Sequence, residues 1–84
     1  MTSGAISKIL FAIGYPTAIV CIARLRSIFR HRRTRWLVVH EAGTAAIVAG
    51  WVIEGNGPAI AFNGLWLTGV AVAWFVTGSR RRSA

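Results

Sequence analysis

The sequence predicts an all-α integral membrane protein that forms one domain, residues 1–84, with three transmembrane helices. Hydrophobic residues make up 55% of the 84 residues and charged residues only 14%, whereas soluble domains average about 25% charged residues. Between Trp36 and Val76 only Glu41 and Glu54 are charged. A soluble helical protein needs polar faces along such a length, and a disordered chain needs low hydrophobicity, so the composition disfavours both classes.

Three apolar segments of bilayer length are the predicted spans, at residues 5–23, 36–53 and 58–76. As helices they extend for roughly 27 to 29 Å, close to the hydrocarbon thickness of about 30 Å. Pro16 lies in the middle of the first segment and predicts a kink, either a tolerated one or a hinge used in gating or assembly. Because basic residues follow this segment, we expect it to be retained and not cleaved as a signal peptide.

The connections between the spans differ in charge and length. Residues 54–57 read Glu-Gly-Asn-Gly and precede Pro58, which predicts a tight turn that joins the second and third spans as an antiparallel hairpin. The first connection, residues 24–35, and the C-terminal tail, residues 78–84, are strongly basic and contain no acid. The positive-inside rule therefore predicts that both lie in the cytoplasm and that the N-terminus lies outside.

The arginines of these two segments indicate a multi-pass protein of the cytoplasmic (inner) membrane whose partner is a bilayer with anionic headgroups. The run in residues 24–35 lacks the interleaved aromatics of a base-stacking surface, which disfavours nucleic acid as a partner. The residues that we assign to topology or to lipid headgroups are Arg24, Arg26, Arg30, Arg32, Arg33, Arg35, Arg80, Arg81 and Arg82.

Polar side chains inside the spans are the candidate functional residues. His40 and Glu41 form the only ionisable pair within a span, and an intramembrane acid is a functional candidate by default. The pair either lines an ion or proton path or has a structural role, solvated at the interface or paired with a basic residue. Adjacent helical positions point about 100° apart, so we expect the two side chains not to share a face. Asn63, in the third span, is a candidate for hydrogen bonding across helices.

Small residues at four-residue spacing form a stripe in the second span: Ala42, Ala46 and Gly50. Such a stripe lets two helix backbones approach closely. It serves packing either within one chain or between copies. We therefore expect a homo-oligomer or a subunit of a membrane complex.

Signatures of enzymes are missing from the sequence. It contains no Asp, no glycine-rich phosphate loop followed by Lys, and a single cysteine, Cys21. No third ligand follows His40 and Glu41 at helical spacing, which disfavours a metal site. The sequence therefore predicts a protein that is not an enzyme and that holds neither a metal nor a cofactor.

Three short spans, an external N-terminus, a cytoplasmic C-terminus and the tail Arg80-Arg81-Arg82 together resemble the small three-span phage holins. The resemblance covers the whole chain in topology and charge pattern, without a shared sequence motif. It implies a protein that self-associates in the cytoplasmic membrane and permeabilises it during host cell lysis, with no catalytic residues. Two other classes stay open: a non-catalytic accessory subunit of a larger membrane complex, and a small ion- or proton-conducting protein built around Glu41.

Overall fold

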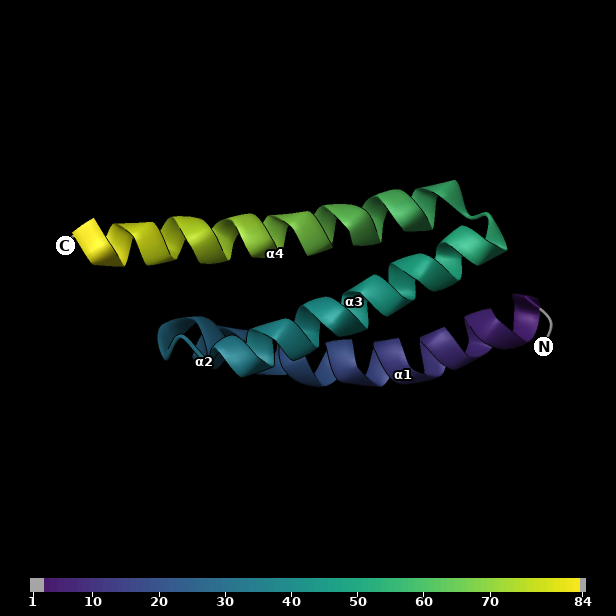
Figure 1. The fold of residues 1–84 in the computed structure, drawn as a ribbon, viewed down its shortest axis with the longest axis horizontal. Coiled ribbons are helices and arrows are strands. Elements are labelled where there is room, and N and C mark those ends of the chain that lie inside the picture. Colours follow the sequence, from purple (N-terminus) through teal and green to yellow (C-terminus); the bar gives the residue numbers. More distant parts are fainter. Residues whose placement is uncertain (1–2, 84) are drawn as a thin grey trace.

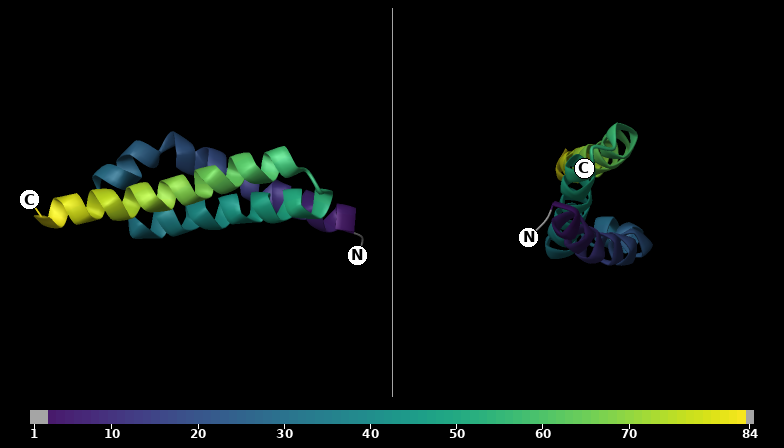
Figure 2. Two further views of the ribbon diagram at one scale, coloured as in Figure 1. Left: turned by 90° about the horizontal axis from the view of Figure 1, so that it is seen from above. Right: turned by 90° about the vertical axis from the view of Figure 1, so that its right-hand side faces the viewer.

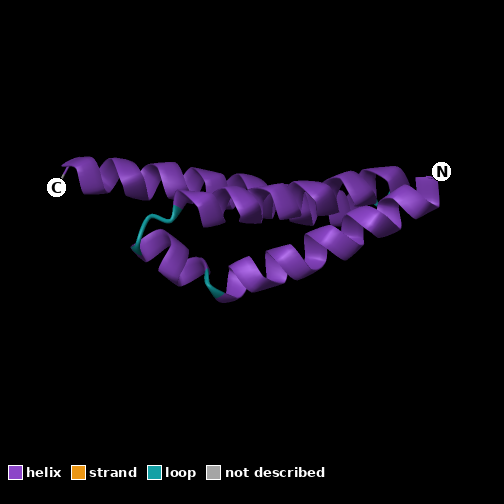
Figure 3. Cartoon of the chain, turned by 60° about the horizontal axis from the view of Figure 1, so that its bottom comes forward, coloured by secondary structure: helices purple, strands orange, loops and turns teal. Residues whose placement is uncertain are grey.

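The structure is a computed structural model that describes the backbone of residues 3–83 and the side chains of residues 4–80. Four helices follow one another: α1 (Ser3–Ala23), α2 (Leu25–Arg30), α3 (Thr34–Glu54) and α4 (Gly57–Ser83) (Figure 1). Over the described residues, the remaining chain forms short turns and no strand (Figure 3). The predicted all-α class is thus confirmed.

Three of these helices are long and apolar enough to cross a membrane: Gly4–Ala23, Thr34–Glu54 and Gly57–Arg80. They match the three predicted spans, and α4 continues beyond its predicted end at Val76 into the arginine tail. The continuation is physically reasonable because arginine is a good helix former and no proline follows. The first connection is also largely helical, since α2 occupies its first half and α3 already begins at Thr34.

The helices lie roughly side by side in an elongated molecule of 51 × 21 × 17 Å. Seen from the end, α3 lies between α1 and α4 (Figure 2). The short α2 and the C-terminus are at one end, while the N-terminus and the α3–α4 turn are at the other (Figure 1). The two basic segments therefore meet at one end of the molecule, as the charge pattern requires.

Glycines set the close packing of α1 against α3. A Cβ atom built on Gly14 would lie 2.7 Å from the carbonyl oxygen of Gly43, so the two backbones nearly touch at this point. One and two turns further along α3, Ile47 is buried and Gly50 makes room for the ring of Phe11, 2.5 Å from where a Cβ would stand. This interface makes α1 and α3 the most tightly packed pair.

The turn between α3 and α4 has the tight form that the sequence predicts. Gly55 ends α3 in the left-handed conformation, with φ of 72°, which favours glycine. The side-chain Oδ1 of Asn56 then accepts a hydrogen bond from the backbone N–H of Ala59, 3.2 Å away, and so caps the start of α4. The antiparallel arrangement of α3 and α4 follows from this turn.

A small apolar core closes the α2 end of the molecule. It contains five buried residues, which come from all four helices: Cys21, Ile28, Leu37, Val70 and Trp74. Leu25 and Phe29 of α2 pack against this core, and the ring of Phe29 meets that of Trp74 edge to face at 5.4 Å. Through these contacts α2 folds back against α4.

Candidate functional site

The intramembrane candidates His40 and Glu41 belong to a polar cluster that joins α3 to α4. His40 is fully buried, and its Nδ1 lies 3.2 Å from Oε1 of Glu41. On the other side of the ring, the indole Nε1 of Trp66 lies 3.1 Å from Nε2 of His40. A carboxylate, an imidazole and an indole thus follow one another across two predicted spans.

The order of donors in this cluster follows from the indole. An indole N–H can only donate, so Nε2 of His40 accepts and carries no proton. The imidazole proton then resides on Nδ1, which donates to Glu41. The cluster therefore holds a neutral His40 in one tautomer beside a carboxylate whose side chain is 23% exposed.

The functional groups of His40 and Glu41 meet although the two residues do not share a face of α3. The Cβ directions of adjacent helical residues do differ by about 100°. The longer Glu41 side chain nevertheless bends back to Nδ1. It does so because the buried imidazole, held by Trp66 on its other edge, leaves Nδ1 as an unsatisfied donor in an apolar surrounding.

Asn63 lies near this cluster but bonds to its own helix. Its Nδ2 donates to the carbonyl oxygen of Ala59 at 2.8 Å, so the predicted bond to another helix is replaced by one within α4. Asn63 and Thr44 line an apolar groove of about 410 Å³ between α1, α3 and α4. Thr44 likewise bonds back to the carbonyl oxygen of His40, at 3.0 Å.

The small-residue stripe of α3 is divided by the structure. Gly50 is buried under Phe11, Ala46 is half-buried and Ala42 is exposed. The face that packs on α1 is built from Gly43, Ile47 and Gly50, so the stripe contributes Gly50 to this face but does not coincide with it. The reason is rotational: every face of α3 is apolar, and spacing alone does not say which face turns toward α1.

Arg32 stands apart from the other arginines because it binds the backbone and an aromatic ring of α4. Its Nη1 donates to Oγ1 of Thr77 and its Nη2 donates to the carbonyl oxygen of Trp74, both at 3.0 Å. Its guanidinium carbon lies 3.6 Å above the indole ring of Trp74. Gly78 provides the room, since a Cβ there would lie 2.5 Å from Nη2.

From the sequence, Arg32 was grouped with the arginines assigned to topology or headgroups, and its contacts with α4 were not predicted. One signal lies in the conformation, because Arg32 is the only described residue other than glycine with a positive φ, 50°. That conformation is visible only in the folded chain. The strained turn at residues 31–33 aims the guanidinium at the last turns of α4.

The remaining arginines of both segments lie at the same end of the molecule, and those with described side chains are exposed. Arg26, Arg30 and Arg80 surround one recess, whereas Arg24 and Arg33 line a smaller one on another side. Arg35 lies in the first turn of α3. The side chains of Arg81 and Arg82 lie outside the described residues.

Pro16 lies on the surface of α1, and Cys21 lies in the apolar core. Pro16 is exposed, and α1 continues through it as one helix. Cys21 is buried in the core at the α2 end, with its Sγ 4.0 Å from the carbonyl oxygen of Trp36. Among the described residues, no group of three His, Cys, Asp or Glu side chains is arranged to hold a metal ion.

Comparisons with known proteins do not assign a function to this chain. No family model, curated protein or solved structure matches this chain significantly.

Proposed function

We propose that this chain is a holin-like protein of the cytoplasmic membrane that self-associates and permeabilises the bilayer. The observation that carries the proposal is the exposure of its spans. Only 22%, 33% and 11% of the residues in the apolar windows of α1, α3 and α4 are buried within the chain. Helices that bury so little of themselves have most of their surface available to lipid or to other copies.

One polar and one small residue at the accessible surface of the molecule support self-association. The half-buried Asn63 lines the groove between α1, α3 and α4. In lipid, polar and small side chains favour contacts between helices over contacts with acyl chains. Ala42, exposed on α3, adds a small residue that permits a second helix to approach closely.

The cluster of His40, Glu41 and Trp66 weighs against the ion-path alternative, because these polar groups are bonded to one another within the chain. The accessory-subunit alternative predicts a chain that stays monomeric without its partner. These two classes therefore differ from the holin-like one in measurable ways.

The test is expression of the wild-type chain in bacteria, with the membrane potential followed by a dye and oligomers detected by chemical crosslinking. We expect crosslinked oligomers and a collapse of the potential. Ala42→Leu should reduce both, because it adds bulk to an exposed face without disturbing the α1–α3 packing. Ala61→Leu, at an exposed position of α4, is the matched control for added hydrophobic volume.

Two results would contradict the proposal. A monomeric wild type that leaves the potential unchanged would favour the accessory subunit. Conductance lost in Glu41→Gln while oligomers persist would favour an ion path through the His40–Glu41 cluster.

A further inference from the structure

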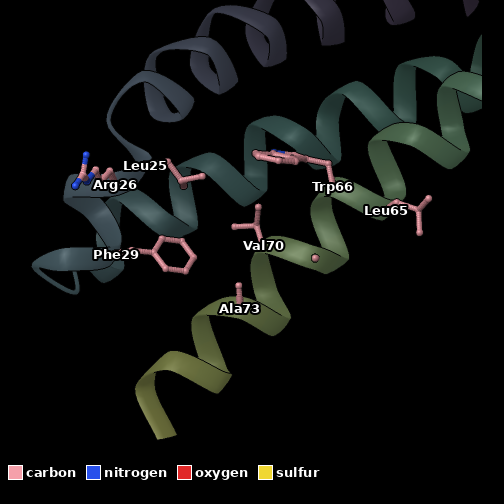
Figure 4. Close-up of a pocket in the computed structure, with 8 residues that line it drawn as sticks. Leu25, Arg26, Phe29, Leu65, Trp66, Val70 and Ala73 are labelled. Carbon is pink, nitrogen blue, oxygen red and sulfur yellow. The ribbon is translucent and has the colours of Figure 1, made fainter. Parts of the chain in front are cut away.

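The short helix α2 has two faces with different surroundings. Leu25 and Phe29 lie on the face that is turned to α4, and together with Val70 and Ala73 they line an apolar groove of about 420 Å³ (Figure 4). Ser27 lies on another face of α2, because successive helical residues point about 100° apart. That second face is turned to the start of α3.

A small recess lies on this second face, between the α1–α2 turn, α2 and the start of α3. Its volume is about 160 Å³, and the residues that line it are Arg24, Ser27, Ile28, Arg33 and Trp36. Arg24 and Arg33 are distant in the sequence, so it is the fold that brings both arginines to one recess. No described residue of α4 takes part in the lining.

The backbone holds both arginines of the recess in place. The N–H of Arg24 donates to the carbonyl oxygen of Cys21 at 3.1 Å, and the N–H of Arg33 donates to that of Ile28 at 2.9 Å. Cys21 and Ile28 are themselves buried in the core. Arg32 fastens the same turn to α4. The recess is therefore formed before a ligand binds, which lowers the entropic cost of binding.

Neither arginine of the recess is paired within the part of the chain that the structure describes. Over residues 4–80, the guanidinium groups of Arg24 and Arg33 have no carboxylate and no hydrogen-bond acceptor. The chain has only two acidic side chains, and both bond elsewhere: Glu41 to His40, and Glu54 to a serine at the opposite end of the molecule. The recess is therefore positively charged.

Two neutral donors complete the lining. The hydroxyl of Ser27 and the indole N–H of Trp36 also make no hydrogen bond among the described residues. Helix α3 begins beside the recess without a side-chain cap and without an acid in its first turn, so the positive end of its dipole adds to the field. Guanidinium, hydroxyl and indole groups all donate, so their complement is an anion with several acceptor oxygens.

We propose that this recess binds one phosphate group between the guanidinium groups of Arg24 and Arg33. Ser27 and Trp36 donate to the remaining oxygens. The planar fork of arginine matches phosphate geometry, and such charge-assisted bonds are strong. The volume of about 160 Å³ is below the roughly 300 to 1,000 Å³ of sites for drug-sized molecules, so the recess suits one small group and not a nucleoside or a hydrocarbon chain.

The phosphate belongs either to the headgroup of an anionic lipid or to a free phosphate ion. Trp36 favours the headgroup, because tryptophan at the end of a span lies at headgroup level and Trp36 opens the second predicted span. The inference goes beyond the holin-like function and does not depend on permeabilisation. Only the lipid source of the phosphate depends on the membrane placement of the chain.

The experiment is a ¹⁵N NMR titration of the purified full chain in dodecyl maltoside micelles, which contain no phosphate. The indole resonance of Trp36, assigned by its loss in Trp36→Phe, reports binding of dioleoyl phosphatidylglycerol or of sodium phosphate. We expect a shift that saturates at one phosphatidylglycerol per chain, at least about tenfold more tightly than with sodium phosphate. Tighter saturation by sodium phosphate would support the site and assign it to the free ion. No saturable shift with either probe would overturn the proposal.

Two double variants separate a built site from general attraction to a basic surface. Arg24→Gln/Arg33→Gln should weaken binding at least about 25-fold, since each arginine near an anionic headgroup contributes roughly fivefold. Arg26→Gln/Arg35→Gln removes the same charge at exposed positions that do not line the recess, and it should weaken binding clearly less. Equal losses in the two double variants would contradict the proposal.

A second pair of variants tests the recess without changing the charge. Ser27→Leu fills the recess and should abolish the saturable shift. Thr34→Leu is the matched control, because Thr34 is also exposed near this end of the molecule but does not line the recess. Unchanged binding in Ser27→Leu would show that the arginines act only as surface charges, and the proposal would be wrong. Because binding is measured on purified protein, its failure is distinguishable from a failure of the holin-like function.

Discussion

At the scale of single residues, Arg32 shows how one member of a charged run acquires a separate role. Its guanidinium donates to two oxygens of α4 and lies on the face of Trp74. Hydrogen bonds that involve a charged donor are about twice as strong as neutral ones. A cation over an indole ring adds roughly 0.5 to 2 kcal/mol.

We predict that Arg32→Ala lowers the free energy of unfolding in micelles by about 2 to 3 kcal/mol, from the loss of charge-assisted bonds and the ring contact. Arg32→Lys should restore little of it, because an ammonium lacks the planar fork that reaches both oxygens. Arg35→Ala is the control, as Arg35 is exposed at the same end. An equal loss in both alanine variants would show that Arg32 is not an anchor.

The tautomer of His40 gives a second prediction at this scale. Because the indole of Trp66 donates to Nε2, ¹⁵N NMR should show His40 protonated on Nδ1. Trp66→Phe removes that donor and should shift the imidazole toward a mixture of tautomers. His31, exposed in the turn after α2, serves as an internal control whose signals stay unchanged. An Nε2-protonated His40 in the wild type would contradict the cluster.

At the scale of the helices, the α1–α3 interface rests on glycine rather than on large side chains. Gly14 and Gly43 bring two helix backbones together, and Gly50 receives the ring of Phe11. The Phe11 ring lies 4.7 Å from the ring of Trp51 at a tilt of 48°, and Nε1 of Trp51 donates to the hydroxyl of Tyr15 at 3.0 Å. Close backbone approach of this kind is the usual way in which helices associate in lipid.

We predict that Gly14→Ala destabilises the fold, because overpacking a tight contact costs about 1 to 3 kcal/mol. The new methyl would lie 2.7 Å from the carbonyl oxygen of Gly43, which is backbone and cannot move aside easily. Alanine gains roughly 1 kcal/mol over glycine in helix propensity, so the expected net loss of stability is up to about 2 kcal/mol. Unfolding in micelles measures it, and Gly64→Ala, in open surroundings, should be neutral or stabilising.

At the scale of the whole molecule, the arrangement brings all basic segments to one end. The α2 helix and the end of α4 lie together there, whereas the α3–α4 turn lies at the other end (Figure 1). The positive-inside rule therefore predicts that this end of the molecule lies in the cytoplasm, since each arginine costs about 2.5 to 3.5 kcal/mol at the bilayer centre.

We predict that cysteines introduced at Arg30 or Arg80, in a chain with Cys21→Ala, resist an impermeant thiol reagent in intact cells. A cysteine at Asn56, in the turn at the opposite end, should be labelled. All three positions are exposed in the structure, so the difference reports the side of the membrane. The reverse labelling pattern would show an inverted topology.

The sequence by itself determined the spans, the tight turn and the clustering of charge. These depend on local quantities: the length of an apolar run against the bilayer thickness, the Gly-Asn-Gly before Pro58, and the position of each arginine. Each of these local quantities can be evaluated without knowing which helix faces pack together. The all-helical class followed directly from them.

Only the tertiary structure decided which faces of the helices meet. In a span that is apolar all round, the sequence carries no signal of rotation, so Gly43 and Ile47 could not be preferred over Ala42 and Ala46. Arg32 differs from the other arginines because the turn that contains it directs its guanidinium to α4. His40 bonds to Glu41 through Nδ1 because Trp66 of α4 occupies its Nε2. Such contacts are made between residues distant in the chain, and their energies exist only once the helices are packed.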